Sequence, residues 1–138
     1  MTKAENLDSW INEYSYKMVK ELKDGKVNLG EIDKALGVLC NDGVYGYYVY
    51  CKSKSNGKSD EKIKSPMFSQ FISNIVKEFD DIVYSGRELK SFKSLYEYDG
   101  YFSNLSTDIH KLLFFKDILE KILTYARYHA KAEGDINE

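Results

Sequence analysis

The sequence contains one proline and two cysteines among 138 residues. Because proline interrupts helices and marks turns, its scarcity favours long helices over a β-fold with many turns. Two cysteines, Cys40 and Cys51, are too few for a disulfide framework, and no Cys-x-x-Cys pair indicates a metal site. On one helix they would lie roughly 16 Å apart, which is too far for a disulfide bond. We therefore expect both to be reduced core residues of an intracellular protein.

Long apolar segments and an excess of one charge are also missing. No segment approaches the length needed to span a bilayer, and the first residues lack the apolar run of a signal peptide. The formal net charge is −2, so any binding of nucleic acid requires a local basic patch. We expect a cytoplasmic protein that does not bind membranes and that forms one helical domain over residues 1–138.

Recognised catalytic and metal-binding patterns are absent as well. The sequence has no His-Glu-x-x-His, Walker A, Gly-x-Ser-x-Gly or Glu-x-x-His pattern. The Arg-x(4–6)-His pattern of small helical ribonucleases of the HEPN type is missing too, since Arg127 stands only two residues before His129. We interpret His110 and His129 as solvated helix positions, and the acidic pair Asp80-Asp81 as a solvated helix end. The protein is predicted not to be an enzyme and to have no metal and no cofactor.

Apolar residues recur at helical spacing through most of the chain. The pattern predicts a helix over 7–24, capped by Asn6 or Asp8, and a second segment from Leu29-Gly30. Pro66, with Ser65 as its cap, begins a third helix that reaches about residue 84.

The C-terminal half continues this pattern. A short fourth helix is expected around Leu89 to Tyr96, followed by a turn at Tyr98 to Tyr101. The last helix is the clearest, with Thr107 or Asp108 as its cap and a broad apolar stripe to Ala126. The fold class is therefore all-α, a compact bundle of about five helices with a long C-terminal helix and a frayed tail over 133–138.

The aromatic stretch 38–51 can be interpreted in two ways. Its tyrosines and valines are strand formers, and Asn41-Asp42-Gly43 is typical of a hairpin turn. However, a lone hairpin is marginally stable and no other segment offers a partner strand. This absence favours a helix, in which the tyrosines form the packed centre of the bundle and Gly43 and Gly46 allow a neighbouring helix to approach.

A lysine-rich segment follows at once. Residues 52–65 are predicted to form a flexible basic loop with a local charge of about +3. Lysines can neutralise phosphates without reading bases, although a loop of this kind can also be simply solvated. The candidate phosphate contacts in this loop are Lys52, Lys54, Lys58, Lys62 and Lys64.

The order of these features resembles the small α-helical subunit of type III-B CRISPR (Cmr) RNA-guided effector complexes. The similarity rests on Lys34 to Tyr45, on Val49 to Lys54 and on Leu123 to Ala132. In that family an amphipathic helix leads to Asn-Gly, then to an apolar run ending in Ser-Lys and a variable basic loop. Asp42 separates Asn41 from Gly43 here, and the proline that the family has near Gly37 is missing.

The resemblance implies a non-catalytic subunit that packs against other subunits of the effector complex and can stack on itself. It also implies contact with guide RNA and target nucleic acid through the lysine loop, with Lys17, Lys20 and Arg127 as weaker contacts. Two alternatives remain open. One is a helical protein–protein interaction module with an exposed apolar surface, and the other is a small nuclease whose site converges from separate helices.

Overall fold

The computed structural model describes residues 6–84 and 92–134, and every regular element within these ranges is helical. The four longest helices are α1 (Leu7–Asp24), α2 (Gly30–Lys54), α5 (Leu95–Leu105) and α6 (Ile109–Ala132). Between α2 and α5 lie a 3₁₀-helix, η1 (Ser59–Lys64), and one continuous helical run, made of α3 (Pro66–Phe68), the π-helical turn η2 (Ser69–Ser73) and α4 (Asn74–Val83). The predicted all-α bundle with a long C-terminal helix is confirmed.

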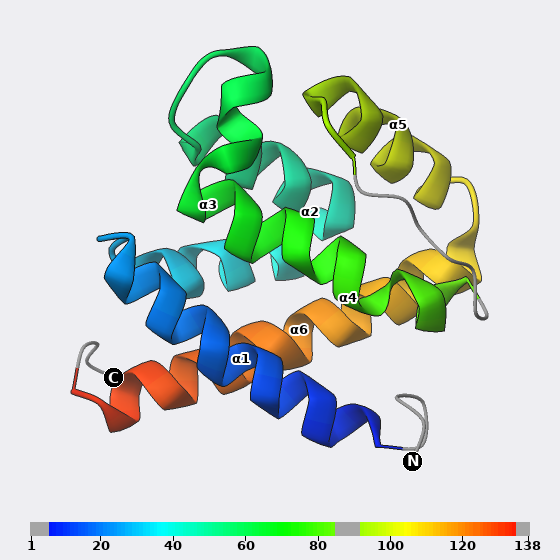
Figure 1. The fold of residues 1–138 in the computed structure, drawn as a ribbon. Coiled ribbons are helices and arrows are strands. Elements are labelled where there is room, and N and C mark those ends of the chain that lie inside the picture. Colours follow the sequence, from blue (N-terminus) through cyan, green and yellow to red (C-terminus); the bar gives the residue numbers. More distant parts are fainter. Residues whose placement is uncertain (1–5, 85–91, 135–138) are drawn as a thin grey trace.

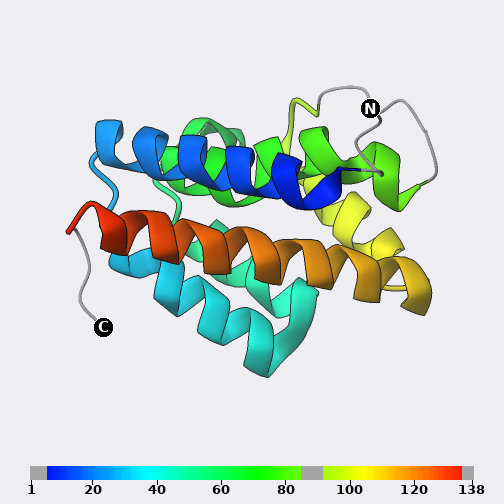
Figure 2. The same ribbon diagram turned by 90° about the horizontal axis from the view of Figure 1, so that it is seen from below.

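Helix α6 lies between α1 and the first half of α2 (Figures 1 and 2). The expected cap is present, because the Asp108 carboxylate accepts a hydrogen bond from the Lys111 amide at 3.2 Å. Helix α1 runs parallel to α6, and the Ser15 hydroxyl donates across the interface to the Ile122 carbonyl at 2.9 Å. The predicted apolar stripe of α6 is buried from Phe115 to Ala126. This stripe places α6 at the centre of the bundle.

Helix α2 bends sharply at Gly43, where φ is 83° and ψ is −173° (Figure 2). The backbone on both sides of the bend is helical, so the hairpin interpretation is wrong and the helical one is confirmed. The bend turns the second half of α2 away from α6 and towards α3 and α5. Neither glycine admits a neighbouring helix, because a Cβ at Gly43 would have open space and one at Gly46 would meet only Asp42.

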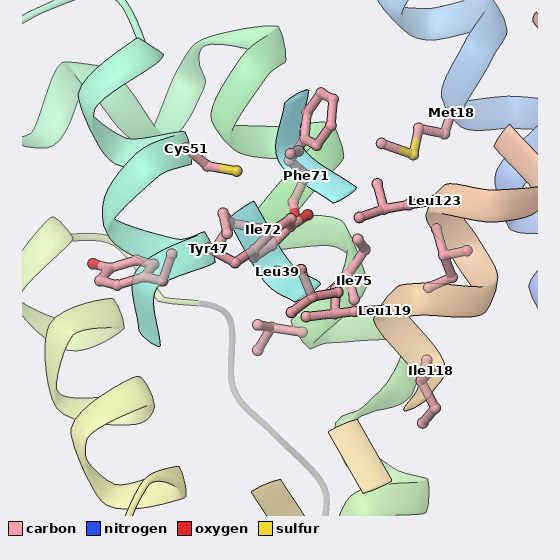
Figure 3. Packing of buried hydrophobic residues seen from close by; sticks show 14 of the residues in the cluster. Met18, Leu39, Tyr47, Cys51, Phe71, Ile72, Ile75, Ile118, Leu119 and Leu123 are labelled. Atoms are coloured by element: carbon pink, nitrogen blue, oxygen red, sulfur yellow. The ribbon is translucent and has the colours of Figure 1, made fainter. Parts of the chain in front are cut away.

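The tyrosines after the bend divide between core and surface. Tyr47 and Tyr48 are fully buried, as expected of the packed centre, whereas Tyr45 is exposed. The Tyr48 ring stacks on Phe102 of α5 with 4.4 Å between ring centroids. Figure 3 shows Tyr47 and Cys51 of α2 pointing towards residues of η2, α4 and α6 in one shared core. Cys51 is buried as predicted, but the expectation for Cys40 is wrong, because Cys40 is exposed.

Two backbone carbonyls of the π-helical turn η2 accept hydrogen bonds from tyrosine hydroxyls. Tyr14 of α1 donates to the Gln70 carbonyl at 2.8 Å, and Tyr47 of α2 donates to the Phe71 carbonyl at 2.6 Å. A π turn interrupts the α-helical bonding pattern, and buried carbonyls require a partner. Burial raises the pKa of both tyrosines, so their hydroxyls stay protonated donors. The two hydroxyls therefore fix η2 between α1 and α2.

Several local expectations from the sequence are wrong. Residues 98–101 do not form a turn but lie inside α5, and Leu89, the predicted start of that helix, lies outside the described residues. Residues 52–65 are not a loop throughout, because α2 continues to Lys54 and η1 occupies 59–64. Asn6 and Ser65 precede helices without a side-chain capping bond. Of the predicted frayed tail, Glu133 pairs with Lys23 at 3.0 Å, and residues 135–138 lie outside the described residues.

Candidate nucleic-acid interface

Lys52, the first predicted phosphate contact, joins α2 to α5. Its ammonium group lies 3.1 Å from the Asp99 carboxylate and 5.2 Å from the centroid of the Tyr48 ring. The Tyr48 hydroxyl donates to the same carboxylate at 2.5 Å. Burial and this hydrogen bond raise the pKa of Tyr48, which keeps the hydroxyl a donor. The charge of Lys52 is therefore paired with an acid of the same chain, in a contact that joins α2 to α5.

Lys62 likewise makes its contacts within the protein. From the 3₁₀-helix η1 its ammonium group donates to the carbonyls of Lys52 and Ser55, both at 3.1 Å. These carbonyls belong to the end of α2, where a helix leaves acceptors without an internal partner and carries a partial negative charge. Lys62 thus acts as a cap for α2 and folds the segment 55–64 back onto the helix.

Lys54, Lys58 and Lys64 remain on the surface. All three are exposed, and no acidic side chain of the described residues pairs with them. Lys54 lies over the Tyr50 ring, 5.9 Å from its centroid. Of the two acids in this segment, Asp60 accepts a hydrogen bond from the Leu95 amide at 3.0 Å at the start of α5. The structure thus reduces the five lysines of the predicted loop to three that can meet an external anion.

The three weaker candidates lie on other helices. Lys17 pairs with Glu13 along α1 at 3.1 Å, and Lys20 lies over the Tyr16 ring at 5.5 Å from its centroid. Arg127 of α6 pairs with Asp33 of α2, with 2.5 Å between Nε and Oδ1. Because this ion pair bridges two helices, Arg127 is a structural residue.

One further lysine was not singled out by the sequence. Lys26 lies in the turn between α1 and α2 and lines a pocket together with Lys54. No motif marks it, because only the fold brings the turn at 25–28 next to the end of α2.

A second hollow lies between α1 and the run η2–α4. Its volume is about 440 Å³, and its charged lining residues are two lysines and two glutamates, Lys17, Lys77, Glu21 and Glu78. Because these charges balance, the hollow has no electrostatic preference for an anion. It forms part of the surface near Tyr14 rather than part of the lysine segment.

The histidines and acids do not assemble into a chemical site. His110 is exposed as expected, whereas His129 is partly buried, with Nε2 2.9 Å from Asn12 Oδ1. Asp80 is not solvated, as the sequence suggested, but fully buried, and it accepts a hydrogen bond from the Tyr101 hydroxyl at 3.0 Å. Across residues 6–84 and 92–134, no group of three histidine, cysteine or acidic side chains could hold a metal ion.

Comparisons with known proteins give no relative. The chain matches no protein-family model, no curated protein and no solved structure. Among the helices described, none combines the length and the apolar character needed to cross a membrane.

Proposed function

We propose that the protein is a non-catalytic subunit of a cytoplasmic RNA-guided complex of the type III CRISPR class, which contacts the guide–target duplex through its lysine segment. The observation that carries the proposal is the exposed group Lys54, Lys58 and Lys64, which begins at the last residue of the bent helix α2 and has no acidic partner among the described residues. The order of motifs that resembles the small subunit, and the all-α fold, support it.

A contact of this kind would be made to phosphates. Exposed ammonium groups on a short surface segment neutralise phosphates and carry no sequence information. Lys62 holds this segment against the end of α2, and Asp60 accepts the Leu95 amide at the start of α5, so the exposed lysines project from a defined backbone. A partner duplex would therefore be bound by its shape and charge, with a strong dependence on salt.

A matched pair of variants tests the contact. Lys58→Gln/Lys64→Gln removes two exposed lysines of the segment, and Lys77→Gln/Lys121→Gln removes two exposed lysines elsewhere, with the same change in charge. Binding to a 20-base-pair RNA duplex is measured over a range of salt concentrations. We expect the first variant to weaken binding and to lower the salt slope by about one unit per lysine. Equal behaviour of the two variants would show that only overall charge matters.

The RNA-guided assembly needs a second experiment. The tagged protein is isolated from its native cells, and the RNA bound to it is sequenced. The proposal expects guide RNA with flanking repeat sequence, together with other subunits of the complex. Recovery of the protein with no RNA, or with RNA of random origin, would contradict it.

A second candidate function is supported by the exposed apolar residues of α6. Ile109 and Leu113 stand one turn apart and are 58% and 52% exposed, and Phe114 is 37% exposed. A protein–protein interaction module would use such a surface and would bind no RNA. The same isolation separates the two functions, because the module would be recovered with protein partners and without RNA.

A further inference from the structure

A pocket of about 240 Å³ lies where the turn between α1 and α2 meets the end of α2 and the start of α3. Residues from three separate parts of the chain line it: the turn at 25–28, the segment around Lys54 and Asn56, and Ser65 to Met67. The pocket is below the size of a typical drug-binding cavity but has room for a small polyatomic ion with several water molecules.

The pocket favours an anion. Lys26 and Lys54 supply two positive charges, and the single acid in the lining is Glu31. The Glu31 carboxylate is already engaged, because it accepts the Tyr50 hydroxyl at 2.8 Å and lies 3.6 Å from the Lys34 ammonium group. Two lysines against one carboxylate leave the lining with an excess of positive charge, and Lys34 outside the pocket offsets part of the charge of Glu31.

Neutral donors complete the lining. The Asn28 side-chain oxygen accepts a hydrogen bond from the Gly30 amide at 2.8 Å, which leaves its amide nitrogen free to donate. Asn56 and Ser65 add a second amide and a hydroxyl. Two ammonium groups with amide and hydroxyl donors form a set that suits a tetrahedral oxyanion.

The walls of the pocket are held in place by the fold. The Lys26 and Val27 amides donate to carbonyls of α1 at 3.0 and 2.9 Å, which fixes the turn. Gly25 packs so closely on Pro66 that an added Cβ would lie 2.8 Å from the proline ring. The Lys54 ammonium group lies 5.9 Å from the centroid of the Tyr50 ring, and the Tyr50 hydroxyl is anchored on Glu31. The backbone of the lining therefore requires little ordering when an anion enters.

We propose that this pocket binds a phosphate group, with Lys26 and Lys54 as its charged contacts. The inference rests on the proposed function for the source of the phosphate, which is then one backbone phosphate of the bound nucleic acid. A free phosphate compound has the same chemistry and is the other source. With nucleic acid as the source, the pocket anchors one backbone phosphate and the exposed Lys58 and Lys64 meet its neighbours.

The test begins with inorganic phosphate alone. Amide NMR signals of the whole protein are followed during titration with sodium phosphate at constant ionic strength, with sodium chloride as the reference. We expect saturable shifts confined to residues 25–28 and Asn56. Lys26→Gln/Lys54→Gln should weaken the affinity about three- to tenfold, as expected for two partly exposed charge contacts. The control Lys77→Gln/Lys121→Gln should leave it unchanged. Shifts that do not saturate, or an equal loss in both variants, would overturn the inference.

A second titration with the RNA duplex identifies the source. Shifts of the same amides, and competition with inorganic phosphate, would support the nucleic-acid backbone as the ligand. If phosphate binds and the RNA duplex does not bind the protein at all, the pocket stands as a site for a free phosphate compound and the proposed function fails. If RNA binding depends on Lys58 and Lys64 while phosphate does not occupy the pocket, the proposed function stands and this inference fails.

Discussion

Arg127 of α6 and Asp33 of α2, which are 94 residues apart in the sequence, form an ion pair that connects the two helices, with 2.5 Å between Nε and Oδ1. Both side chains are partly shielded, with 27% and 40% of their surfaces exposed. The pair holds the first half of α2 against α6, on the far side of α6 from α1 (Figure 2). A residue that sequence reasoning assigned to nucleic acid is therefore committed to the fold.

A double-mutant cycle tests this assignment. Arg127→Gln and Asp33→Asn each remove one partner, and the double variant removes both. We expect a coupling free energy of about 0.5–1 kcal/mol, because partly exposed ion pairs contribute in this range. The measurement is denaturant unfolding of the four proteins. RNA affinity should be the same for wild type and for the double variant, which is neutral overall in its change of charge. A loss of RNA affinity in the double variant would restore Arg127 as a contact.

Lys62 and Lys64 are two residues apart, but their substitution should affect different properties: stability at Lys62 and RNA binding at Lys64. Lys62→Gln removes the donor to two carbonyls at the end of α2, so we expect a loss of about 1 kcal/mol in the free energy of unfolding. Lys64→Gln should leave stability unchanged and weaken RNA binding, because the side chain is exposed. Denaturant unfolding and duplex binding are measured for both. The reverse pattern would mean that Lys62, and not Lys64, faces the ligand.

Helices with a regular apolar stripe could be predicted from the sequence, and helix α5 could not. In α1 and α6 the buried residues recur at three and four, and the observed bounds match the expected ones closely. In α5, Asp99 and Gly100 suggested a turn, although both lie inside the helix. A signal for its start was present, since Ser94 and Glu97 have the spacing of a capping box and the Ser94 hydroxyl accepts the Glu97 amide at 3.3 Å. The cap and the burial of Tyr98, Tyr101 and Phe102 outweigh the local turn preference of Asp99 and Gly100.

The candidate site could be predicted only in its composition. The sequence identifies a local excess of lysine, but the partner that commits each lysine lies far away along the chain. Asp99 is 47 residues from Lys52. The pocket near Lys54 depends on a turn that precedes α2, so no local pattern could indicate Lys26. Tertiary contacts of this range are decided by the packing of whole helices, which a single sequence does not encode in any short motif.

Substitution by alanine at two glycines of α2 should change the stability of the protein in opposite directions. Gly43 has a backbone conformation that is almost confined to glycine, so Gly43→Ala should cost about 1–3 kcal/mol of stability through strain or loss of the bend. Gly37 lies in the regular part of the helix, and a Cβ there would meet nothing within 4 Å. Gly37→Ala should therefore raise stability by about 0.5–1 kcal/mol. Thermal and denaturant unfolding measure both. A neutral Gly43→Ala would show that the bend is not fixed by this residue.

The raised pKa of Tyr50 predicts that the protein loses stability in alkali. Burial, followed by the hydrogen bond to Glu31, raises the pKa of Tyr50 to about 12, from an ordinary value near 10. Below pH 10 the hydroxyl is protonated in the folded and unfolded states, so its contribution to stability is fully present there. Between pH 10 and 12 the unfolded chain loses this proton before the folded protein does, and that contribution declines as the pH rises.

Tyr50→Phe removes this titration and should give a shallower fall in the free energy of unfolding over the same interval. Tyr96→Phe, at a residue that is 84% exposed, is the control. Unfolding curves at several pH values, together with tyrosinate absorbance, provide the measurement. Identical slopes for wild type and Tyr50→Phe would contradict the assignment and with it the anchor of Tyr50 on Glu31.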